Sequence, residues 1–531
     1  MDRRQFLLRS GRVVLGAAVL PAVAASCSAS SPSPSGSGTP SPTVPSPTIA
    51  GPPTGADWNQ LAASLDGTLV RPGTKGYIPA SHLFDPKFDS VHPQAIALCR
   101  TVADVQRSIG FARDHETPIA ARSGGHSYAG YSTGHGLVVD VTALDRVAVD
   151  ANAGTAVVGA GTRLIDLYAA TAAHGVAIPG GSCPTVGIAG LALGGGQGVI
   201  GRKFGLTCDS LISAQVVTAD GSVLHCDDRH NQDLYWACRG GGGGNFGIVT
   251  SFTFRTHPLN ELTLFTLDWP WSAADDVLGA WQSWGPGAPD EVWSDCHLVW
   301  RGTSGPAISI NGAFVGTEGQ LTPLLAQLST AAGKPSGTFV RTMPFLEAMM
   351  VEAGCAGKSV AECHLPTQNA AGTLARESSI ARSDFYDVPL SSSAISVMVD
   401  SVTARGGDPI LAGSGGGILL DAMGGVIDRV PPAATAFVHR SSLFTAQYFV
   451  TLPPGASKAV VSRNQKWLDG LWTTLRADAS GFAYQNYIDP ALPDWQHAYY
   501  GRNLPRLTKV KQTYDPKNLF HFAQSIPTTP A

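Results

Sequence analysis

The sequence predicts an α+β protein with two domains, and three observations support this fold class. A chain of 531 residues is long enough for two domains that each bury a hydrophobic core. Between about residues 96 and 254, short apolar runs typical of strands alternate with segments of helical periodicity. Glycine-rich motifs belong to this region and stop from about residue 264 to residue 475. We therefore expect a first domain at 57–262, a second domain at 263–475 with an antiparallel sheet backed by helices, and a C-terminal segment at 476–531 that completes the first domain.

The apolar pattern of the first domain predicts its elements one by one. Apolar residues recur at helical spacing between Ile96 and His115, which predicts a helix packed on a sheet, and a second helix is expected at Leu164–Ala173. The Asp220-Gly221 dipeptide is a strong turn signal, so Leu211–Ala219 and Ser222–His225 should form a hairpin. The other short apolar runs predict strands at Pro118–Arg122, Leu137–Val141, Thr155–Gly159 and Asn245–Phe254.

The junction at residues 155–164 resembles a Rossmann dinucleotide site, because a strand, a Gly-x-Gly turn and a helix follow one another. Leu164 stands where that motif requires its third glycine. No acidic residue ends a second strand about twenty residues later, as the motif also requires. The residues therefore argue against the Rossmann alternative.

The N-terminus predicts export. Arg3 and Arg4, followed by Gln5-Phe6-Leu7-Leu8, resemble a twin-arginine signal, and the apolar stretch 13–25 is shorter than the roughly 20 residues that a membrane span needs. Residues 24–27, Ala-Ala-Ser-Cys, resemble a lipobox with alanine in place of the usual leucine. Residues 1–27 form this signal with its possible lipobox. Either the residues before Cys27 are cleaved off and Cys27 is diacylated, or a signal peptidase cuts at a small residue and Cys27 is removed or idle.

A tether follows this signal. Residues 28–56 consist largely of Ser, Pro, Thr and Gly, a composition that forms an extended linker rather than a core. Such a linker suits an enzyme anchored through Cys27 at the extracellular face of a bacterial membrane, and it also suits a secreted enzyme.

Composition excludes some partners. Charged residues are 14% of the chain, the formal net charge is -4, and no basic run lies outside the N-terminus, so we expect no nucleic-acid partner.

Among nine cysteines, Cys355 and Cys363 are close enough in sequence to close a small loop. No C-x-x-C or clustered His/Cys spacing is present, so we expect no metal. Six tryptophans between residues 269 and 300 should pack in the core of the second domain, although a sugar-stacking platform is the alternative.

Two nucleophilic side chains lie inside glycine-rich segments. His126 belongs to Arg122-Ser-Gly-Gly-His-Ser127, and Cys183 belongs to the segment 180–198, which contains eight glycines. Glycine lets the backbone approach a ligand closely, and successive N–H groups in such turns bind anions. The pattern indicates a phosphate-bearing cofactor to which two side chains can bond covalently. Taken alone, His126 could be a loop histidine bonded to backbone, and Cys183 a buried small hydrophobic residue.

A third motif makes the pattern specific. The segments Tyr484-Gln-Asn-Tyr-Ile-Asp489 and Tyr514-Asp-Pro-Lys-Asn-Leu-Phe520 follow the two glycine motifs in order. Together the motifs resemble the berberine-bridge-enzyme-like branch of FAD-linked oxidases, in the vanillyl-alcohol-oxidase/PCMH superfamily, from about Phe84 to Gln524. The resemblance implies a PCMH-type FAD-binding domain of two α/β subdomains. It also implies FAD bonded to His126 through the flavin 8α-methyl and to Cys183 through C6.

The resemblance further implies which residues surround the cofactor. Besides His126 and Cys183, these are Arg122, Ser123, Gly124, Gly125, Ser127, Val186, Gly187, Gly190, Gly194, Gly195, Gly198, Gly247, Ile248, Val249, Asn486 and Asn518. A twin-arginine pathway suits this cofactor, since it exports proteins that are already folded and loaded.

Two tyrosines are candidate bases for removing a hydroxyl proton. If residues 483–488 form a strand, Tyr484 and Asn486 share one face and Tyr487 points away. The resemblance places the asparagine at the flavin, so we expect Tyr484 to be the catalytic base. Tyr487 should pack or bond its phenol to the backbone. Gln447 matches a position at which the family orients the substrate hydroxyl; the alternative is a strand residue satisfied by a neighbour.

Three functions remain to be compared. The leading hypothesis is an exported FAD oxidase that oxidises an alcohol group of a small molecule or carbohydrate, with O₂ reduced to H₂O₂. The second is a dehydrogenase that passes electrons to a quinone or another carrier; Val186, a small residue three positions after Cys183, favours the oxidase by the family resemblance. The third is a lipoprotein that binds a ligand without turnover, which the intact His126, Cys183 and Tyr484 argue against.

Overall fold

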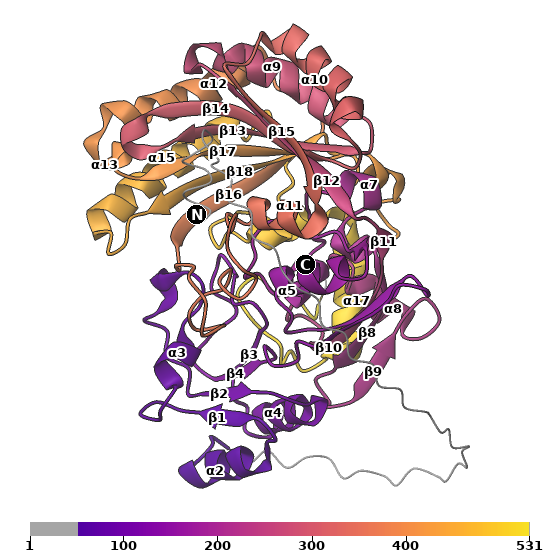
Figure 1. The fold of residues 1–531 in the computed structure, drawn as a ribbon. Coiled ribbons are helices and arrows are strands. Elements are labelled where there is room, and N and C mark those ends of the chain that lie inside the picture. Colours follow the sequence, from indigo (N-terminus) through magenta and orange to yellow (C-terminus); the bar gives the residue numbers. More distant parts are fainter. Residues whose placement is uncertain (1–50, 530–531) are drawn as a thin grey trace.

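A computed structural model describes residues 51–529, and in it the chain folds into two layered units (Figure 1). The expected export signal, with Cys27, lies outside the described residues. The lower unit in Figure 1 contains the strands from the first half of the chain together with the C-terminal helix α17 (Leu504–Tyr514). The upper unit is built on one large sheet. The α+β class expected from the sequence is therefore confirmed.

The first small sheet has the strand order β1-β2-β4-β3. Strand β1 is antiparallel to β2, while β2, β4 and β3 run parallel. The bounds are Thr68–Val70 for β1, Ala95–Leu98 for β2, Ile119–Arg122 for β3 and Leu137–Asp140 for β4.

The expected helix 96–115 is wrong at its N-terminal end. Residues 95–97 are fully buried and form part of strand β2, because a parallel strand covered on both faces is a continuous apolar run. Helix α4 (Val102–Asp114) starts only after Thr101, whose hydroxyl accepts from the amide of Asp104 in a capping box. The apolar periodicity of the sequence therefore continues across two separate elements, strand β2 and helix α4.

The second sheet has the order β5-β6-β10-β8-β9, and all neighbours are antiparallel. Its strands are β5 (Val147–Asp150), β6 (Thr155–Gly159), β8 (Leu211–Val217), β9 (Val223–Cys226) and β10 (Ile248–Arg255). The expected β8–β9 hairpin is confirmed. Because β6 has antiparallel partners on both sides, the turn into helix α5 (Leu164–Ala172) is not part of a Rossmann unit, which needs parallel strands.

The upper unit is a seven-stranded antiparallel sheet with the order β15-β12-β14-β13-β17-β18-β16. Its strands are β12 (Glu261–Trp269), β13 (Val292–Trp300), β14 (Pro306–Phe314), β15 (Gly337–Pro344), β16 (Ser378–Tyr386), β17 (Gly415–Ala422) and β18 (Phe444–Leu452).

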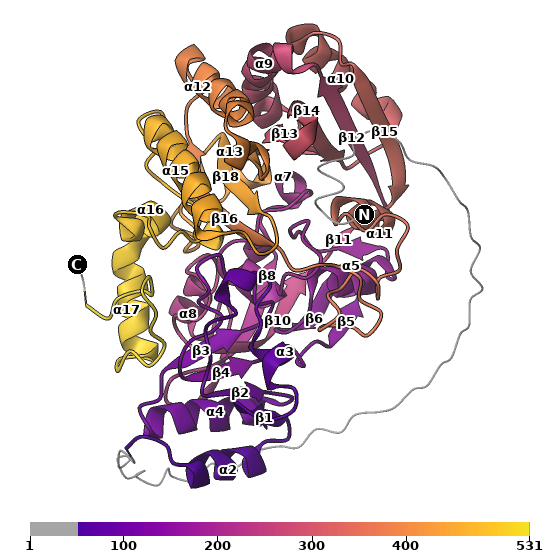
Figure 2. The same cartoon turned by 90° about the vertical axis from the view of Figure 1, so that its left-hand side faces the viewer.

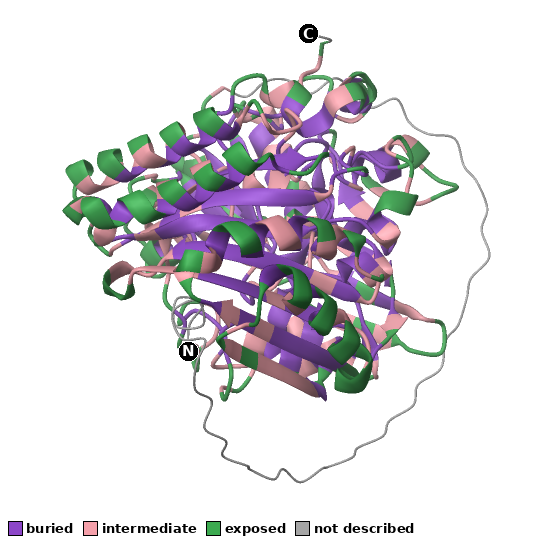
Figure 3. Ribbon diagram, turned by 90° about the horizontal axis from the view of Figure 1, so that it is seen from above, coloured by how far each residue is buried: buried purple, intermediate pink, exposed green. Residues whose placement is uncertain are grey.

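Four helices cover the outer face of this sheet (Figure 2). They are α9 (Ala274–Gly287), α10 (Glu318–Ala332), α12 (Ser392–Thr403) and α15 (Lys458–Leu475). Viewed from above, their outer surfaces are exposed while the strands beneath them are buried (Figure 3). The opposite face of the sheet is directed toward the first unit.

Shorter elements complete the fold. They are β7 (Val176–Ala177), which pairs with β11 (His257–Pro258), and the helices α2 (Gly55–Ser64), α3 (Tyr77–Ser81), α6 (Ile188–Leu193), α7 (Gly201–Phe204), α8 (Gln232–Ala237), α11 (Phe345–Glu352), α13 (Pro409–Ala412), α14 (Val426–Arg429) and α16 (Trp495–Tyr500). Within the described part of the chain, no helix is both long and apolar enough to cross a membrane.

The C-terminal segment returns to the first unit, where α17 lies beside α8 (Figure 1). The buried Lys511 ammonium donates to the Asp515 carboxylate at 2.7 Å and to the Asn245 and Phe520 carbonyls at 2.8 and 2.6 Å. A buried cation is tolerated when it is paired and hydrogen-bonded in this way. It ties the chain end to the loop before β10.

The tryptophans of the upper unit divide into two groups. Trp269 and Trp281 are buried in the core, as expected from the helix-backed sheet. Trp293 and Trp300 are only partly buried; they pack against the same core and also line cavities on the inner side of the sheet. Cys355 and Cys363 form the disulfide that their spacing suggested.

Candidate active site

A cavity of about 880 Å³ opens between the glycine-rich loops of the first unit and the inner face of the seven-stranded sheet. This volume is in the range of cofactor and ligand pockets. Most of the residues expected around the cofactor line it. They are Arg122, Ser123, Gly124, Gly125, His126, Ser127, Cys183, Val186, Gly187, Gly190, Gly247, Ile248, Val249 and Asn486, joined by the three catalytic candidates Gln447, Tyr484 and Tyr487.

Four expected cofactor residues lie outside this lining. A Cβ atom added to Gly194 would meet Asn486, and one added to Gly195 would meet Phe437, so these glycines serve close packing between protein segments. Gly198 lines a smaller neighbouring cavity. Asn518 occupies a turn with φ +55° and bonds to His521.

His126 lies in the loop after β3 and faces the cavity. Its Nε2 is 2.9 Å from the Thr185 hydroxyl, and the Phe84 ring stacks on the imidazole with centroids 4.1 Å apart. These two contacts fix the ring plane. A proton on Nε2, donated to Thr185, places the nucleophilic lone pair on Nδ1.

Cys183 belongs to a second loop that packs directly against the His126 loop. A Cβ on Gly124 would lie 2.1 Å from the Gly187 nitrogen, and one on Gly187 would lie 2.3 Å from the Gly124 nitrogen. The two backbones therefore touch, and only glycine permits that approach. Because Thr185 also bonds to His126, the two nucleophiles lie in adjoining walls of one cavity.

The structure contradicts the strand expected at residues 483–488. Residues Gln485–Tyr487 form a 3-10 turn, closed by a 2.9 Å hydrogen bond from the Tyr487 amide to the Tyr484 carbonyl. The alternation that separated Tyr484 from Tyr487 therefore does not apply. The backbone pairs with β16 only before this turn, where the Phe385 amide donates to the Phe482 carbonyl, and the Tyr484 amide donates to the Ser383 side chain rather than to a strand carbonyl.

The Tyr484 hydroxyl is hydrogen-bonded to other groups of the protein. Its oxygen accepts from the amides of Gly196 and Gln197 at 3.0 and 3.1 Å, and from the Asn486 side-chain amide at 3.0 Å. The side chain is 2% exposed. Burial raises the pKa of Tyr484 to about 12, although the three donors act in the opposite direction. Phenol-to-backbone bonding, expected for Tyr487, is found at Tyr484.

Tyr487 is the more accessible of the two phenols. It is half-buried and lines both the main cavity and the smaller one. Its ring stacks on Tyr128 with centroids 5.6 Å apart and packs edge-on against Tyr484 at 5.0 Å. Its phenol is therefore held at the junction of the two cavities.

Tyr128 is a site residue that the sequence reasoning missed. It stands two positions after His126 and lines the cavity. Its hydroxyl accepts a 2.9 Å hydrogen bond from the Gln447 side-chain amide, which comes from the buried inner face of β18. The only sequence signal was its position directly after the Arg122–Ser127 motif.

The smaller cavity, of about 110 Å³, continues from the main one. The two share Gln197, Gln447 and Tyr487 in their linings. The sheet contributes polar side chains here: the His297 ring nitrogen lies 2.8 Å from the Asp295 carboxylate, and the Asn311 amide donates to the same group at 3.0 Å. Burial, and after it the charge of Asp295, raise the pKa of Glu352 to about 8.

Among residues 51–529, no group of three or more His, Cys, Asp or Glu side chains is arranged to hold a metal ion. The cavity instead combines two nucleophiles, glycine backbone and a volume of about 880 Å³. That set fits a flavin dinucleotide, which would present its ring to His126 and Cys183.

Comparison with known proteins agrees with this geometry. The family described as "FAD binding domain" matches residues 93–227, and the family "Berberine and berberine like" matches residues 483–527. The chain is 33% identical to the uncharacterized FAD-linked oxidoreductase YgaK of Bacillus subtilis (strain 168) over 442 residues, which cover 82% of this chain and 91% of that protein. The chain belongs to the berberine-bridge-enzyme-like family of FAD-linked oxidoreductases.

Other members of the family are similar over most of their length. The chitooligosaccharide oxidase of Gibberella zeae is 32% identical over 456 residues, covering 82% of this chain and 87% of that one. Among solved structures, Physcomitrella patens BBE-like 1 superposes with a TM-score of 0.80 at 32% identity, covering 89% of this chain and all of that one. A chitooligosaccharide oxidase structure superposes with a TM-score of 0.79 at 28% identity, with 89% of this chain covered. The protein is thus an FAD-binding oxidoreductase of this family.

Proposed function

We propose that this family member oxidises a hydroxyl group of a carbohydrate, with FAD attached covalently to both His126 and Cys183 and with O₂ as the electron acceptor. The observation that carries the proposal is the placement of these two nucleophiles in adjoining walls of one cavity, opposite a polar sheet face. When bound, the flavin would accept a hydride from the substrate carbon and pass its electrons to O₂, which yields H₂O₂.

We assign the base to Tyr487 and not to Tyr484. A general base must come within hydrogen-bond reach of the proton that it removes. Tyr484 is 2% exposed, and its oxygen already accepts three hydrogen bonds from protein groups. Tyr487 lines both cavities, and its phenol can receive a proton there.

Gln447 and Tyr128 would hold the substrate hydroxyl. Gln447 donates its amide hydrogen to Tyr128, so its carbonyl oxygen is oriented by that bond. The Tyr128 ring in turn stacks on Tyr487. These three side chains form one patch between the sheet and the His126 loop, and a hydroxyl bound there lies beside the base.

The polar character of the neighbouring cavity supports a hydroxyl-rich substrate. Asp295, His297 and Asn311 line it from strands β13 and β14. Gln197 adds a buried side-chain oxygen that has no hydrogen-bond partner among the described residues. A buried acceptor is costly to leave unsatisfied, and sugar hydroxyls would donate to it. The similarity to chitooligosaccharide oxidase points to the same substrate class.

Val186 supports O₂ as acceptor. It lines the cavity three residues after Cys183 and is small, which by family resemblance leaves the oxygen-reactive face of the flavin open. Reoxidation of the reduced enzyme in air separates an oxidase from a dehydrogenase. Reoxidation within seconds supports the oxidase, whereas reduced flavin that persists in air would establish a dehydrogenase.

We also propose export through the twin-arginine pathway, with Arg3 and Arg4 as its signal and Cys27 as a lipid attachment site. Covalent attachment suits this location, because a cofactor lost outside the cell cannot be replaced. Fractionation of cells that express the full chain tests this, since Arg3→Lys combined with Arg4→Lys should retain the protein inside, and Cys27→Ala should release it from the membrane.

A peroxide-coupled screen over mono- and oligosaccharides and aromatic alcohols tests the activity. We expect H₂O₂ from one or more sugars and bleaching of the flavin by the same sugars without air. Bleaching and peroxide from aromatic alcohols alone would refute the carbohydrate class. No bleaching by any compound would favour a ligand-binding lipoprotein without turnover.

A further inference from the structure

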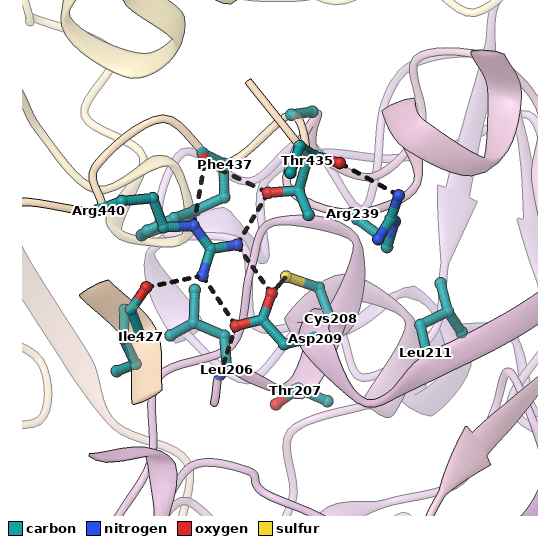
Figure 4. Close-up of polar contacts among 12 residues, drawn as sticks. Leu206, Thr207, Cys208, Asp209, Leu211, Arg239, Ile427, Thr435, Phe437 and Arg440 are labelled. Carbon is teal, nitrogen blue, oxygen red and sulfur yellow. Dashed lines mark hydrogen bonds and ion pairs between the residues drawn. The ribbon is translucent and has the colours of Figure 1, made fainter. Parts of the chain in front are cut away.

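Arg440 lies outside both cavities, in the segment between α14 and β18, and its side chain is 1% exposed. It forms a two-point ion pair with Asp209, in which Nη1 and Nη2 each donate to one carboxylate oxygen at 2.8 Å (Figure 4). Nη2 also donates to the Thr435 hydroxyl at 2.8 Å, and Nε donates to the Phe437 carbonyl at 3.3 Å. Asp209 overcomes the effect of burial and raises the pKa of Arg440, which keeps it cationic.

Asp209 shapes the short turn Thr207–Asp209. Its Oδ2 accepts from the Leu206 amide at 2.9 Å and at the same time from Arg440. The next two amides of the turn, those of Thr207 and Cys208, are directed at the segment that contains Gly195 and Gly196. The Thr207 amide donates to the Gly196 carbonyl and the Cys208 amide donates to the Gly195 carbonyl, each at 2.9 Å.

Two peptide groups are thereby held from both sides. The carbonyls of Gly195 and Gly196 accept from the Asp209 turn, while the N–H groups of the same two peptides, on Gly196 and Gln197, donate to the Tyr484 oxygen. Gly195 and Gly196 have φ of +115° and +87°, a backbone conformation that residues other than glycine rarely adopt. A peptide whose carbonyl is already bonded is a stronger N–H donor.

The position of Tyr484 in turn determines the position of Tyr487. The two rings pack edge to face at 5.0 Å, and the Tyr487 amide donates to the Tyr484 carbonyl at 2.9 Å. Tyr484 thus fixes both the backbone turn and one side of the ring of the proposed base.

We propose that Arg440 is a positioning residue for the base, and that it acts through Asp209, the Gly195–Gln197 peptides and Tyr484. This inference rests on the proposed function only in assigning the base to Tyr487. Lysine cannot make the two-point contact with Asp209, so Arg440→Lys keeps the charge but loses the geometry. Misplacement of a catalytic group by a small distance costs up to about a hundredfold in rate.

The first test is a double-mutant cycle on flavin reduction, measured anaerobically with the best sugar of the peroxide screen. We expect Arg440→Lys and Tyr484→Phe each to slow reduction by about tenfold, with little change in the substrate dissociation constant. The double variant should be no slower than either single one, because both break the same relay. Effects that multiply to about a hundredfold would overturn the relay.

Hydrogen exchange provides a second readout that needs no substrate. In Arg440→Lys, peptides covering 194–197 and 484–487 should exchange their amide hydrogens faster than in the native holoenzyme. Arg405→Lys is the matched control, since Arg405 is also fully buried but bonds to Asn464 beneath the outer helices. It should leave both peptides and the reduction rate unchanged. If Arg440→Lys does not fold, Asp209→Asn removes the same ion pair from the other side.

The outcomes separate this inference from the proposed function. Slow reduction in Tyr487→Phe together with normal reduction and exchange in Arg440→Lys would refute the relay alone. Normal reduction in Tyr487→Phe would refute the assignment of the base. Faster exchange at 484–487 in Arg440→Lys would still establish the structural coupling.

Discussion

The side-chain amide of Gln447 donates a 2.9 Å hydrogen bond to the hydroxyl of Tyr128. This bond joins the sheet of the second unit to the loop that carries His126. It places the residues that would select the substrate directly beside the residues that would hold the cofactor.

Tyr487→Phe should slow anaerobic flavin reduction by roughly 10²–10⁴-fold, the usual contribution of a positioned acid or base. The flavin should stay attached, because neither His126 nor Cys183 is changed. Stopped-flow absorbance of the flavin measures the rate. Tyr484→Phe is the comparison, and its reduction should slow by only about tenfold. If Tyr484→Phe is the slower enzyme, Tyr484 is the base.

Tyr484→Phe should instead lower the stability of the folded protein. The substitution leaves the amides of Gly196 and Gln197 buried without their acceptor, which costs about 1–3 kcal/mol in the free energy of unfolding. Urea unfolding of the holoenzyme followed by tryptophan fluorescence measures this difference. Tyr487→Phe should change the free energy of unfolding by less, and equal losses in the two variants would argue against the difference in their environments.

Gln447→Leu should weaken substrate binding more than it slows the chemical step. The change removes the bond to Tyr128 and the oriented carbonyl, so the KM for the best sugar should rise by about 2–10-fold, as expected for one or two net hydrogen bonds. Steady-state peroxide formation gives KM and kcat separately. Tyr128→Phe should raise KM in the same direction. An unchanged KM in both variants would remove Gln447 and Tyr128 from the substrate site.

Stability should fall at acidic pH because of His439. This histidine is 4% exposed, and burial lowers its pKa to about 3. Its pKa in the unfolded chain is about 6.5, so between these values only the unfolded state binds the proton. The free energy of unfolding should therefore decrease as pH falls below about 6.5, by up to about 1.4 kcal/mol per pH unit from this group.

His439→Gln removes the titrating group and keeps a donor for the Tyr499 carbonyl. Urea unfolding at about pH 7 and about pH 5 should show a smaller loss of stability in this variant than in the native protein. His135→Gln, at an exposed position, serves as the control and should retain the native dependence. An identical pH dependence in His439→Gln would show that His439 is not responsible.

Local motifs in the sequence predicted much of the cofactor side of the site. Strand β3, the His126 loop and the Cys183 loop follow from short apolar runs and glycine patterns that need no knowledge of distant residues. The family resemblance supplied the fold and the cofactor, which the comparisons bear out.

The catalytic side depended on contacts that the sequence does not reveal. The hydroxyl of Tyr484, the residue before the turn at 485–487, binds amides 287 and 288 residues earlier in the chain. The Tyr128–Gln447 bond spans 319 residues. A local alternation rule cannot anticipate such pairings, and it therefore pointed Tyr487 away from the cavity that both tyrosines line. The helix expected at 96–115 was too long for a related reason, since burial on both faces of β2 removes the alternation typical of a strand.

The central claim is that FAD is bonded to both His126 and Cys183. Intact mass spectrometry of acid-denatured holoenzyme tests it most directly, together with peptide mapping. We expect the mass of the processed chain plus one FAD, a yellow acid pellet, and one flavin peptide that contains both residues. His126→Ala and Cys183→Ala should each keep the flavin through the remaining bond, and the double variant should lose it on denaturation. A colourless pellet from the native holoenzyme, with only the apoprotein mass, would contradict the account.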